Sequence, residues 1–256
     1  MLPREHGAYG QIAFPLIAAY AVAGVSTASL LITVTVIAGF LAHEPAAIVL
    51  GQRGGRVKRE LGASATRWLV CCLAVGIAAG LAAVSRLDAI TRWSVAIPAV
   101  PAVALMLAMI KGREKSWFGE AAAALAFAGA AVPIALAAGA SMDMALAVAI
   151  PFALLFTTTT LAVRVVILRV RGGGDPGAAT ATQRAALVLA GISTLMMGAL
   201  AMTGWLASSV LIAAAPGLLT GAIVAVRPPA ATRLRSLGWS LVAVSTLTTL
   251  IVIATA

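Results

Sequence analysis

Each of the two histidines in this 256-residue chain stands beside a glutamate, as Glu5-His6 and as His43-Glu44. An imidazole nitrogen and a carboxylate oxygen can bind a divalent metal, and a carboxylate can also fix the histidine tautomer for proton transfer. Ionisable groups within or beside apolar segments are costly and therefore mark candidate sites. The alternative for the second pair is a hydrogen-bonded buried patch beside Pro45, which has no backbone N–H. Both interpretations remain open from the sequence.

Glu120 opens a later apolar segment and joins the two histidine pairs as a candidate. If the segments that carry His6 and His43 are antiparallel neighbours, the two imidazoles can meet and share a divalent metal; a bis-histidine haem is a second alternative. Adjacent residues on a helix point about 100° apart, so one member of each pair is expected to face the centre. The predicted acid, base or metal-binding residues are Glu5, His6, His43, Glu44 and Glu120.

Basic residues cluster at 51–59 and at 111–115 and recur at 164–171. Arginine offers a planar fork for phosphate oxygens and lysine a point charge, so these residues are predicted to hold a diphosphate or an anionic lipid headgroup. The alternative for any single residue is chain orientation or interfacial anchoring. The hydroxyls of 157–160 either face the same cavity or bond back to their own helix. The anion-binding candidates are Arg53, Arg56, Lys111, Arg113, Arg164 and Arg169.

The elements that must position these residues are apolar segments. The chain is 62% hydrophobic and 10% charged, whereas a soluble domain is about a quarter charged, so a water-soluble fold is excluded. Apolar segments of about 20 residues are long enough to cross a bilayer, where only helices satisfy the backbone of such segments. We predict one all-α transmembrane domain over 1–256, a bundle of nine helices at 9–26, 30–50, 68–85, 93–110, 120–139, 144–163, 185–204, 207–226 and 238–255.

The distribution of positive charge predicts the orientation. With the N-terminus in the cytoplasm and the C-terminus outside, only Arg86 and Arg92 of the 18 basic residues fall on the outer side, which agrees with the positive-inside rule. The net charge of +10 is therefore attributed to topology, and no nucleic-acid partner is predicted. The polar connections 51–67 and 169–184 are the longest, and the predicted location is a bacterial-type inner membrane.

Several stretches carry a family resemblance. They are Pro3 to Tyr9, Lys111 to Glu120, the Phe156-Thr-Thr run that leads to Arg164, and Arg227-Pro228 followed by Leu237-Gly238-Trp239. Together they resemble the YwiC-like membrane proteins over nearly the whole chain, with the Glu-His-Gly opening as the most specific element. Few members of that family have an assigned activity, so the resemblance implies a fold more than a function.

More distantly, the layout is similar to the UbiA prenyltransferase superfamily, which implies a nine-helix bundle that binds an isoprenyl diphosphate through Mg²⁺ and two aspartate-rich motifs. This chain departs from that pattern, since its only aspartates are Asp88, Asp143 and Asp175. His43-Glu44 stands where the first motif is expected, and Thr-rich sequence with Arg164 and Arg169 replaces the second. The resemblance therefore does not carry over the Mg²⁺-diphosphate chemistry.

The functional hypothesis is a UbiA-like bundle with a cytoplasm-facing polar pocket that binds or modifies an isoprenoid, another anionic lipid or a quinone-like amphiphile. Whether the protein is an enzyme stays open. The first alternative is a non-catalytic, haem-binding or metal-binding subunit of a respiratory or other membrane complex, with other membrane subunits as partners. A transporter is a further alternative, disfavoured because few polar residues lie in the outer half.

Overall fold

The computed structural model describes residues 6–170, 176–205 and 207–255, and these residues form helices and turns without a strand. The predicted all-α class is confirmed. The helices are α1 (His6–Ala23), α2 (Thr27–Val49), α3 (Gly55–Val84), α4 (Ala89–Ser94), α5 (Ala96–Ile110), α6 (Trp117–Gly129), α7 (Ala131–Ala137), α8 (Met142–Val170), α9 (Pro176–Met202), α10 (Ser208–Val226) and α11 (Leu234–Thr255), with a short 3₁₀ turn at Ala231–Arg233.

Helices α4 and α5 form one rod interrupted at a single residue, and so do α6 and α7. The break between α4 and α5 falls at Val95 and that between α6 and α7 at Ala130, each three residues before a proline. Pro98 and Pro133 cannot donate to the carbonyl four residues earlier, so the helical hydrogen-bond ladder is interrupted there. Counted as rods, the described residues contain eight helices long and apolar enough to cross a membrane, together with the shorter apolar helix Gly7–Ala23. The predicted bundle of nine helices is confirmed for the described residues, with eight of the nine long and apolar enough to span a membrane.

The connection predicted at 51–67 is largely helical instead. α3 begins at Gly55 and continues for 30 residues, about 45 Å at 1.5 Å per residue, which exceeds the ~30 Å hydrocarbon core. Hydropathy reports only the membrane-buried part of a helix, whereas Arg, Lys, Glu and Ala continue it readily into water. The same correction applies to 169–184, where α8 ends at Val170 and α9 begins at Pro176.

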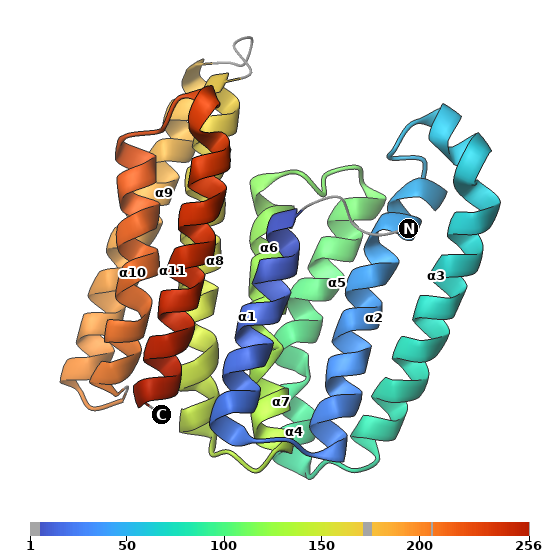
Figure 1. Cartoon of the computed structure of the whole chain (residues 1–256), viewed down its shortest axis with the longest axis horizontal. Helices are drawn as coiled ribbons and strands as arrows, with labels where there is room; N and C mark the ends of the chain where they lie inside the picture. Colours follow the sequence, from blue (N-terminus) through green and yellow to red (C-terminus); the bar gives the residue numbers. More distant parts are fainter. Residues whose placement is uncertain (1–5, 171–175, 206, 256) are drawn as a thin grey trace.

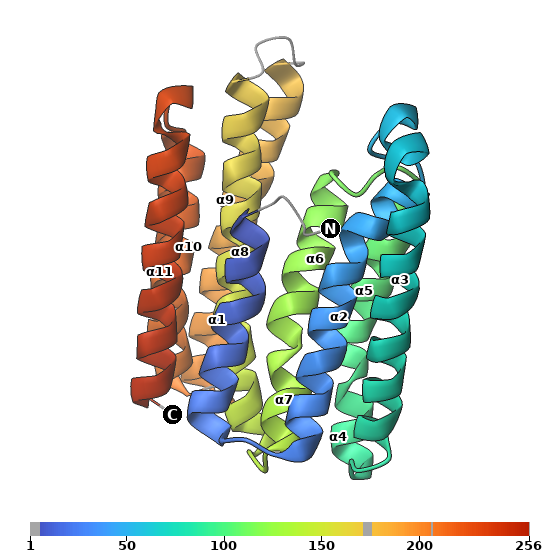
Figure 2. The same ribbon diagram turned by 45° about the vertical axis from the view of Figure 1, so that its right-hand side comes forward.

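The helices form two groups, α2–α7 and α8–α11, which pack directly against each other through α6, α7 and α8, and α1 lies across their junction (Figure 1). Helix α1 packs against α6, α7, α8 and α11, and a second view shows the same order (Figure 2). A single main core forms around it from Ile12, Leu16, Phe152 and neighbouring alanines. The connections at 50–54, 111–116 and 227–230 lie at one end of the bundle, which we call the basic end (Figure 1).

Close packing of α8 and α10 depends on glycine. A Cβ added at Gly217 would lie 2.8 Å from both Cα and Cβ of Leu155, and one at Gly221 would lie 2.9 Å from Cβ of Thr158. Because backbone atoms cannot move aside as a flexible side chain can, the helices would have to separate. Small residues at such crossings let membrane helices approach closely.

We therefore expect Gly217→Ala to destabilise the protein by about 1–3 kcal/mol, the usual effect of overpacking. The measurement is the apparent unfolding temperature of the purified protein in detergent. Gly191→Ala on α9 is the matched control, because nothing lies within 4 Å of its added Cβ. Equal shifts for the two variants would contradict the proposed close crossing.

Candidate functional site

The centre of the candidate site is the Arg53 side chain, which lies between two carboxylates at the basic end. Its Nε donates to both oxygens of Glu44, at 3.0 and 3.2 Å, and its Nη2 donates to Oε2 of Glu44 at 2.7 Å. Its Nη1 donates to Oε1 of Glu114 at 2.8 Å. Glu44 comes from the last two turns of α2, and Glu114 from the connection between α5 and α6. One guanidinium thus joins three segments of the chain.

The connection between α2 and α3 is shaped so that Arg53 reaches back to Glu44. Gly51 and Gly54 have φ values of +82° and +94°, a left-handed backbone that glycine adopts without steric cost. They bracket Gln52 and Arg53 in a tight turn, closed by a hydrogen bond from the N–H of Gly54 to the carbonyl of Gly51. The turn directs both polar side chains toward the α5–α6 connection.

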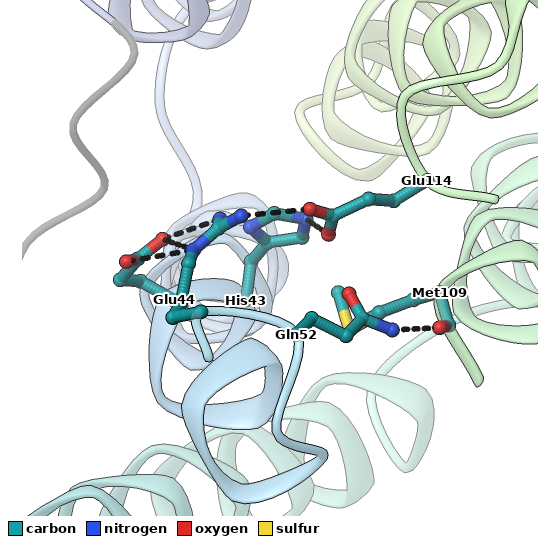
Figure 3. Close-up of polar contacts among 6 residues, drawn as sticks. His43, Glu44, Gln52, Met109 and Glu114 are labelled. Atoms are coloured by element: carbon teal, nitrogen blue, oxygen red, sulfur yellow. Dashed lines mark hydrogen bonds and ion pairs between the residues drawn. The ribbon is translucent and has the colours of Figure 1, made fainter. Parts of the chain in front are cut away.

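His43 completes the cluster, with Nε2 lying 3.5 Å from Oε2 of Glu114 (Figure 3). The His43 side chain is 26% exposed, whereas that of Glu114 is 9% exposed. The separation is too long for a strong hydrogen bond, and Oε2 of Glu114 is buried without a hydrogen-bond partner among the described residues. His43 is therefore the part of the cluster that a ligand can reach, and Glu114 has an unused acceptor beside it.

A second buried acceptor without a donor lies nearby on Gln52. Its Nε2 donates to the carbonyl of Met109 at the end of α5 (Figure 3). Its Oε1 is buried, and the described part of the chain supplies no donor to it. A buried polar atom left unpaired costs about 1–3 kcal/mol, so two such acceptors at one site call for a bound water or ligand group that donates to them.

The electrostatics of the cluster are set by Arg53. Hydrogen bonding to Glu44 raises the pKa of Arg53 above its usual value; burial opposes this, and the charges of Glu114 and Glu44 add to it. With both carboxylates ionised, two negative charges meet one positive charge. The cluster then has an excess of negative charge unless His43 is protonated, and it is suited to receive a proton or a hydrogen-bond donor rather than an anion.

The connection between α5 and α6 is held from a second side by Arg164. Nη1 of Arg164, on α8, donates to the carbonyl of Lys115 at 2.6 Å and to Oε2 of Glu120 at 3.1 Å. Glu120 lies in the first turn of α6, which Ser116 caps by accepting from the N–H of Gly119 at 3.2 Å. The short α5–α6 connection is therefore bound both by Arg53, from the α2–α3 connection, and by Arg164, from α8.

Three of the four threonine hydroxyls of α8 bond back to their own helix, which is one of the two predicted roles. Those of Thr157, Thr158 and Thr159 donate to carbonyls of their own helix at 2.6 Å. Oγ1 of Thr160 instead accepts from Nε2 of Gln11 on α1 at 3.3 Å. One hydroxyl of the four thus contributes to packing between helices at the basic end.

The structure separates the predicted anion-binding residues into two kinds. Arg53 and Arg164 hold glutamates, Arg56 pairs with Glu60 on the exposed start of α3, and Arg169 donates to Gln183 at 2.7 Å. The side chains of Lys111 and Arg113 are exposed and make no hydrogen bond or ion pair to the described residues. These two remain available to an anion.

The remaining predicted site residues lie at the N-terminus. Glu5 falls outside the described residues, and His6 begins α1 with a side chain that is not described, so a metal or haem shared by His6 and His43 stays a prediction. Within the described residues, the histidines, cysteines and acidic residues form no group of three suited to a metal ion. Sequence reasoning did not single out Glu114 or Gln52. A lone acidic residue between Arg113 and Lys115 was the available signal for Glu114.

Comparison with known proteins gives the family. A model described as YwiC-like protein matches residues 2–135, more than half of the chain. The chain belongs to the YwiC-like family. The part matched to the YwiC-like model runs from α1 into α7 and contains the cluster of His43, Glu44, Arg53 and Glu114, whereas Arg164 lies beyond it. No curated protein and no solved structure matches the chain. It is an integral membrane protein of the YwiC-like family, as the sequence predicted.

Proposed function

We propose that the basic end binds the polar head of a membrane amphiphile of the isoprenoid or quinone-like class, with His43 and Glu114 as the pair that exchanges a proton with it. The observation that carries the proposal is the pair of buried acceptors without donors, Oε2 of Glu114 and Oε1 of Gln52, beside a partly exposed histidine. Hydroxyls on the head group would donate to these acceptors, one to each, because buried acceptors are normally paired.

The apolar part of such a ligand is accommodated by the surroundings of the site. His43 lies near the basic end of α2, and Val36 and Gly39, seven and four residues before it, share its face of the helix at about 100° per residue and are half-buried and exposed. The tail of a ligand with its head at His43 would extend along this face toward the membrane interior. Lys111 and Arg113 add positive charge on the same connection as Glu114 and would hold a phosphate or another anionic part of the head.

The chemistry open to this site is general acid–base catalysis or proton uptake. When His43 accepts a proton from a hydroxyl, the imidazolium lies 3.5 Å from the Glu114 carboxylate, which stabilises the positive charge. Arg53 then holds Glu114 in place, because its Nη1 donates to Oε1 of Glu114 while Oε2 faces His43. The pair would act on a ligand that releases or takes up a proton, in the half of a bacterial-type inner membrane that the positive-inside rule assigns to the cytoplasm.

His43→Ala is the test. We expect the variant to retain at least about tenfold less amphiphile than the wild-type protein after purification in mild detergent, because a hydrogen bond to a charged group contributes about 1.5–3 kcal/mol. Native mass spectrometry would measure retention, and menaquinol, whose head has two hydroxyls, and farnesyl diphosphate added separately would distinguish a quinol head from a diphosphate. Arg56→Ala, in an exposed ion pair, is the control. Unchanged retention in His43→Ala would refute the proposal.

A further inference from the structure

The outer surface of α3 carries a feature that the polar cluster does not use. α3 packs mainly against α2, and its other face is exposed, with Ile77 at 60% and Leu81 at 68%. Toward the basic end, this face contains an open hollow of about 360 Å³, lined by Ser64, Arg67, Trp68 and Cys71. These positions are three or four residues apart and form one stripe along the helix.

The hollow contains several hydrogen-bond donors. Arg67 provides a guanidinium, Trp68 an indole N–H and Ser64 a hydroxyl. In the described part of the chain, none of these side chains has a hydrogen bond or ion pair. The nearest acid along the stripe, Glu60, is bound by Arg56 at 2.8 Å. The positive charge of Arg67 is therefore not neutralised by the protein.

The depth of the hollow matches the headgroup region of a bilayer. The apolar part of α3, 68–84, is about 25 Å long at 1.5 Å per residue, close to the hydrocarbon thickness of ~30 Å. Arg67 and Trp68 stand at the basic end of this part, where arginine and tryptophan meet lipid headgroups. Beyond Cys71 the stripe continues to Val75, which is 53% exposed.

We infer that this hollow is a binding site for one anionic phospholipid. The phosphate accepts hydrogen bonds from Arg67, Trp68 and Ser64, and one acyl chain lies along α3 toward Val75. Charge complementarity selects this occupant, because an unneutralised guanidinium favours an anionic headgroup over a zwitterionic one. The site is separate from the polar cluster, so this inference does not depend on the proposed function.

The test is a titration of the purified protein with phosphatidylglycerol and with phosphatidylcholine of the same acyl chains, with bound lipids counted by native mass spectrometry. The wild-type protein should bind one phosphatidylglycerol more tightly than any phosphatidylcholine. Arg67→Gln should weaken that binding roughly fivefold, the factor that corresponds to about 1 kcal/mol per basic residue near a membrane surface. Arg67→Lys keeps the charge and should retain most of the preference.

Arg59→Gln is the matched control, because Arg59 is an exposed arginine on the same helix that does not line the hollow. It removes the same charge and should leave the binding constant within twofold of the wild-type value. Equal weakening by both variants would overturn the inference in favour of diffuse attraction, as would equal binding of the two lipids. A dimer that excludes lipid would overturn it in favour of a second copy of the chain.

Discussion

Arg53→Ala should destabilise the protein by about 3 kcal/mol, since removing one partner of a buried ion pair leaves the other charge uncompensated. Here two carboxylates lose their partner, and the side chains of Glu44 and Glu114 are each only 9% exposed. The expected result is a clearly lower apparent unfolding temperature in detergent, accompanied by weaker amphiphile retention as Glu114 moves away from His43.

The control for this prediction is Arg56→Ala. Arg56 and Glu60 form an ion pair with side chains 85% and 56% exposed, and such exposed pairs contribute about 0–1 kcal/mol. Adding Glu114→Gln to Arg53→Ala should recover part of the loss, because it removes one of the two buried charges. Equal unfolding temperatures for the Arg53 and Arg56 variants would show that the cluster is not a structural centre.

Gly119→Ala should displace the α5–α6 connection. The added Cβ would overlap the carbonyl of Glu114 and lie 2.9 Å from its carbonyl carbon and 3.1 Å from the carbonyl oxygen of Arg113. These are backbone atoms, so the whole connection must shift, at a stability cost of about 1–3 kcal/mol typical of overpacking. Because Glu114 shifts with it, amphiphile retention should fall toward the level of His43→Ala.

A matched substitution separates this effect from the loss of a glycine as such. Gly62→Ala, in the exposed first half of α3, adds a Cβ with nothing within 4 Å. It should leave both unfolding temperature and retention at wild-type values or slightly raise stability, because alanine favours a helix more than glycine does. A Gly119→Ala protein with normal retention would mean that the position of Glu114 does not govern ligand binding.

The binding partners of Arg53 could not be predicted from the sequence. As an arginine in a basic stretch, it was predicted to bind an anion, and in the structure its guanidinium is paired with Glu44 and Glu114. Arg164 likewise holds Glu120 and a backbone carbonyl. A residue's charge indicates what it can bind, but the choice between a ligand and a protein carboxylate depends on which group comes within about 3 Å.

The prediction for His43 and Glu44 depended on their position in an apolar segment. Their burial at the end of an apolar segment could be foreseen from the length of that segment and from the energetic cost of placing ionisable groups there. The structure places both at the basic end, His43 partly exposed and Glu44 buried. The partner of His43 could not be foreseen, because Glu114 is distant in the chain and no periodic pattern links the two.

By itself, the sequence determined the all-α class, the number of spans and the gathering of His43 and Glu44 with the basic connections, because span length and hydropathy are properties of local segments. Only the tertiary structure decided that Arg53 and Glu114 complete the cluster, that Arg164 holds the same connection, and that Gly119 must be glycine. These features depend on the path of two short loops and on the rotation of each helix about its axis. The contacts of Arg53 with Glu114 and of Arg164 with Glu120 join residues that are far apart in the chain, and hydrophobic patterning does not encode them.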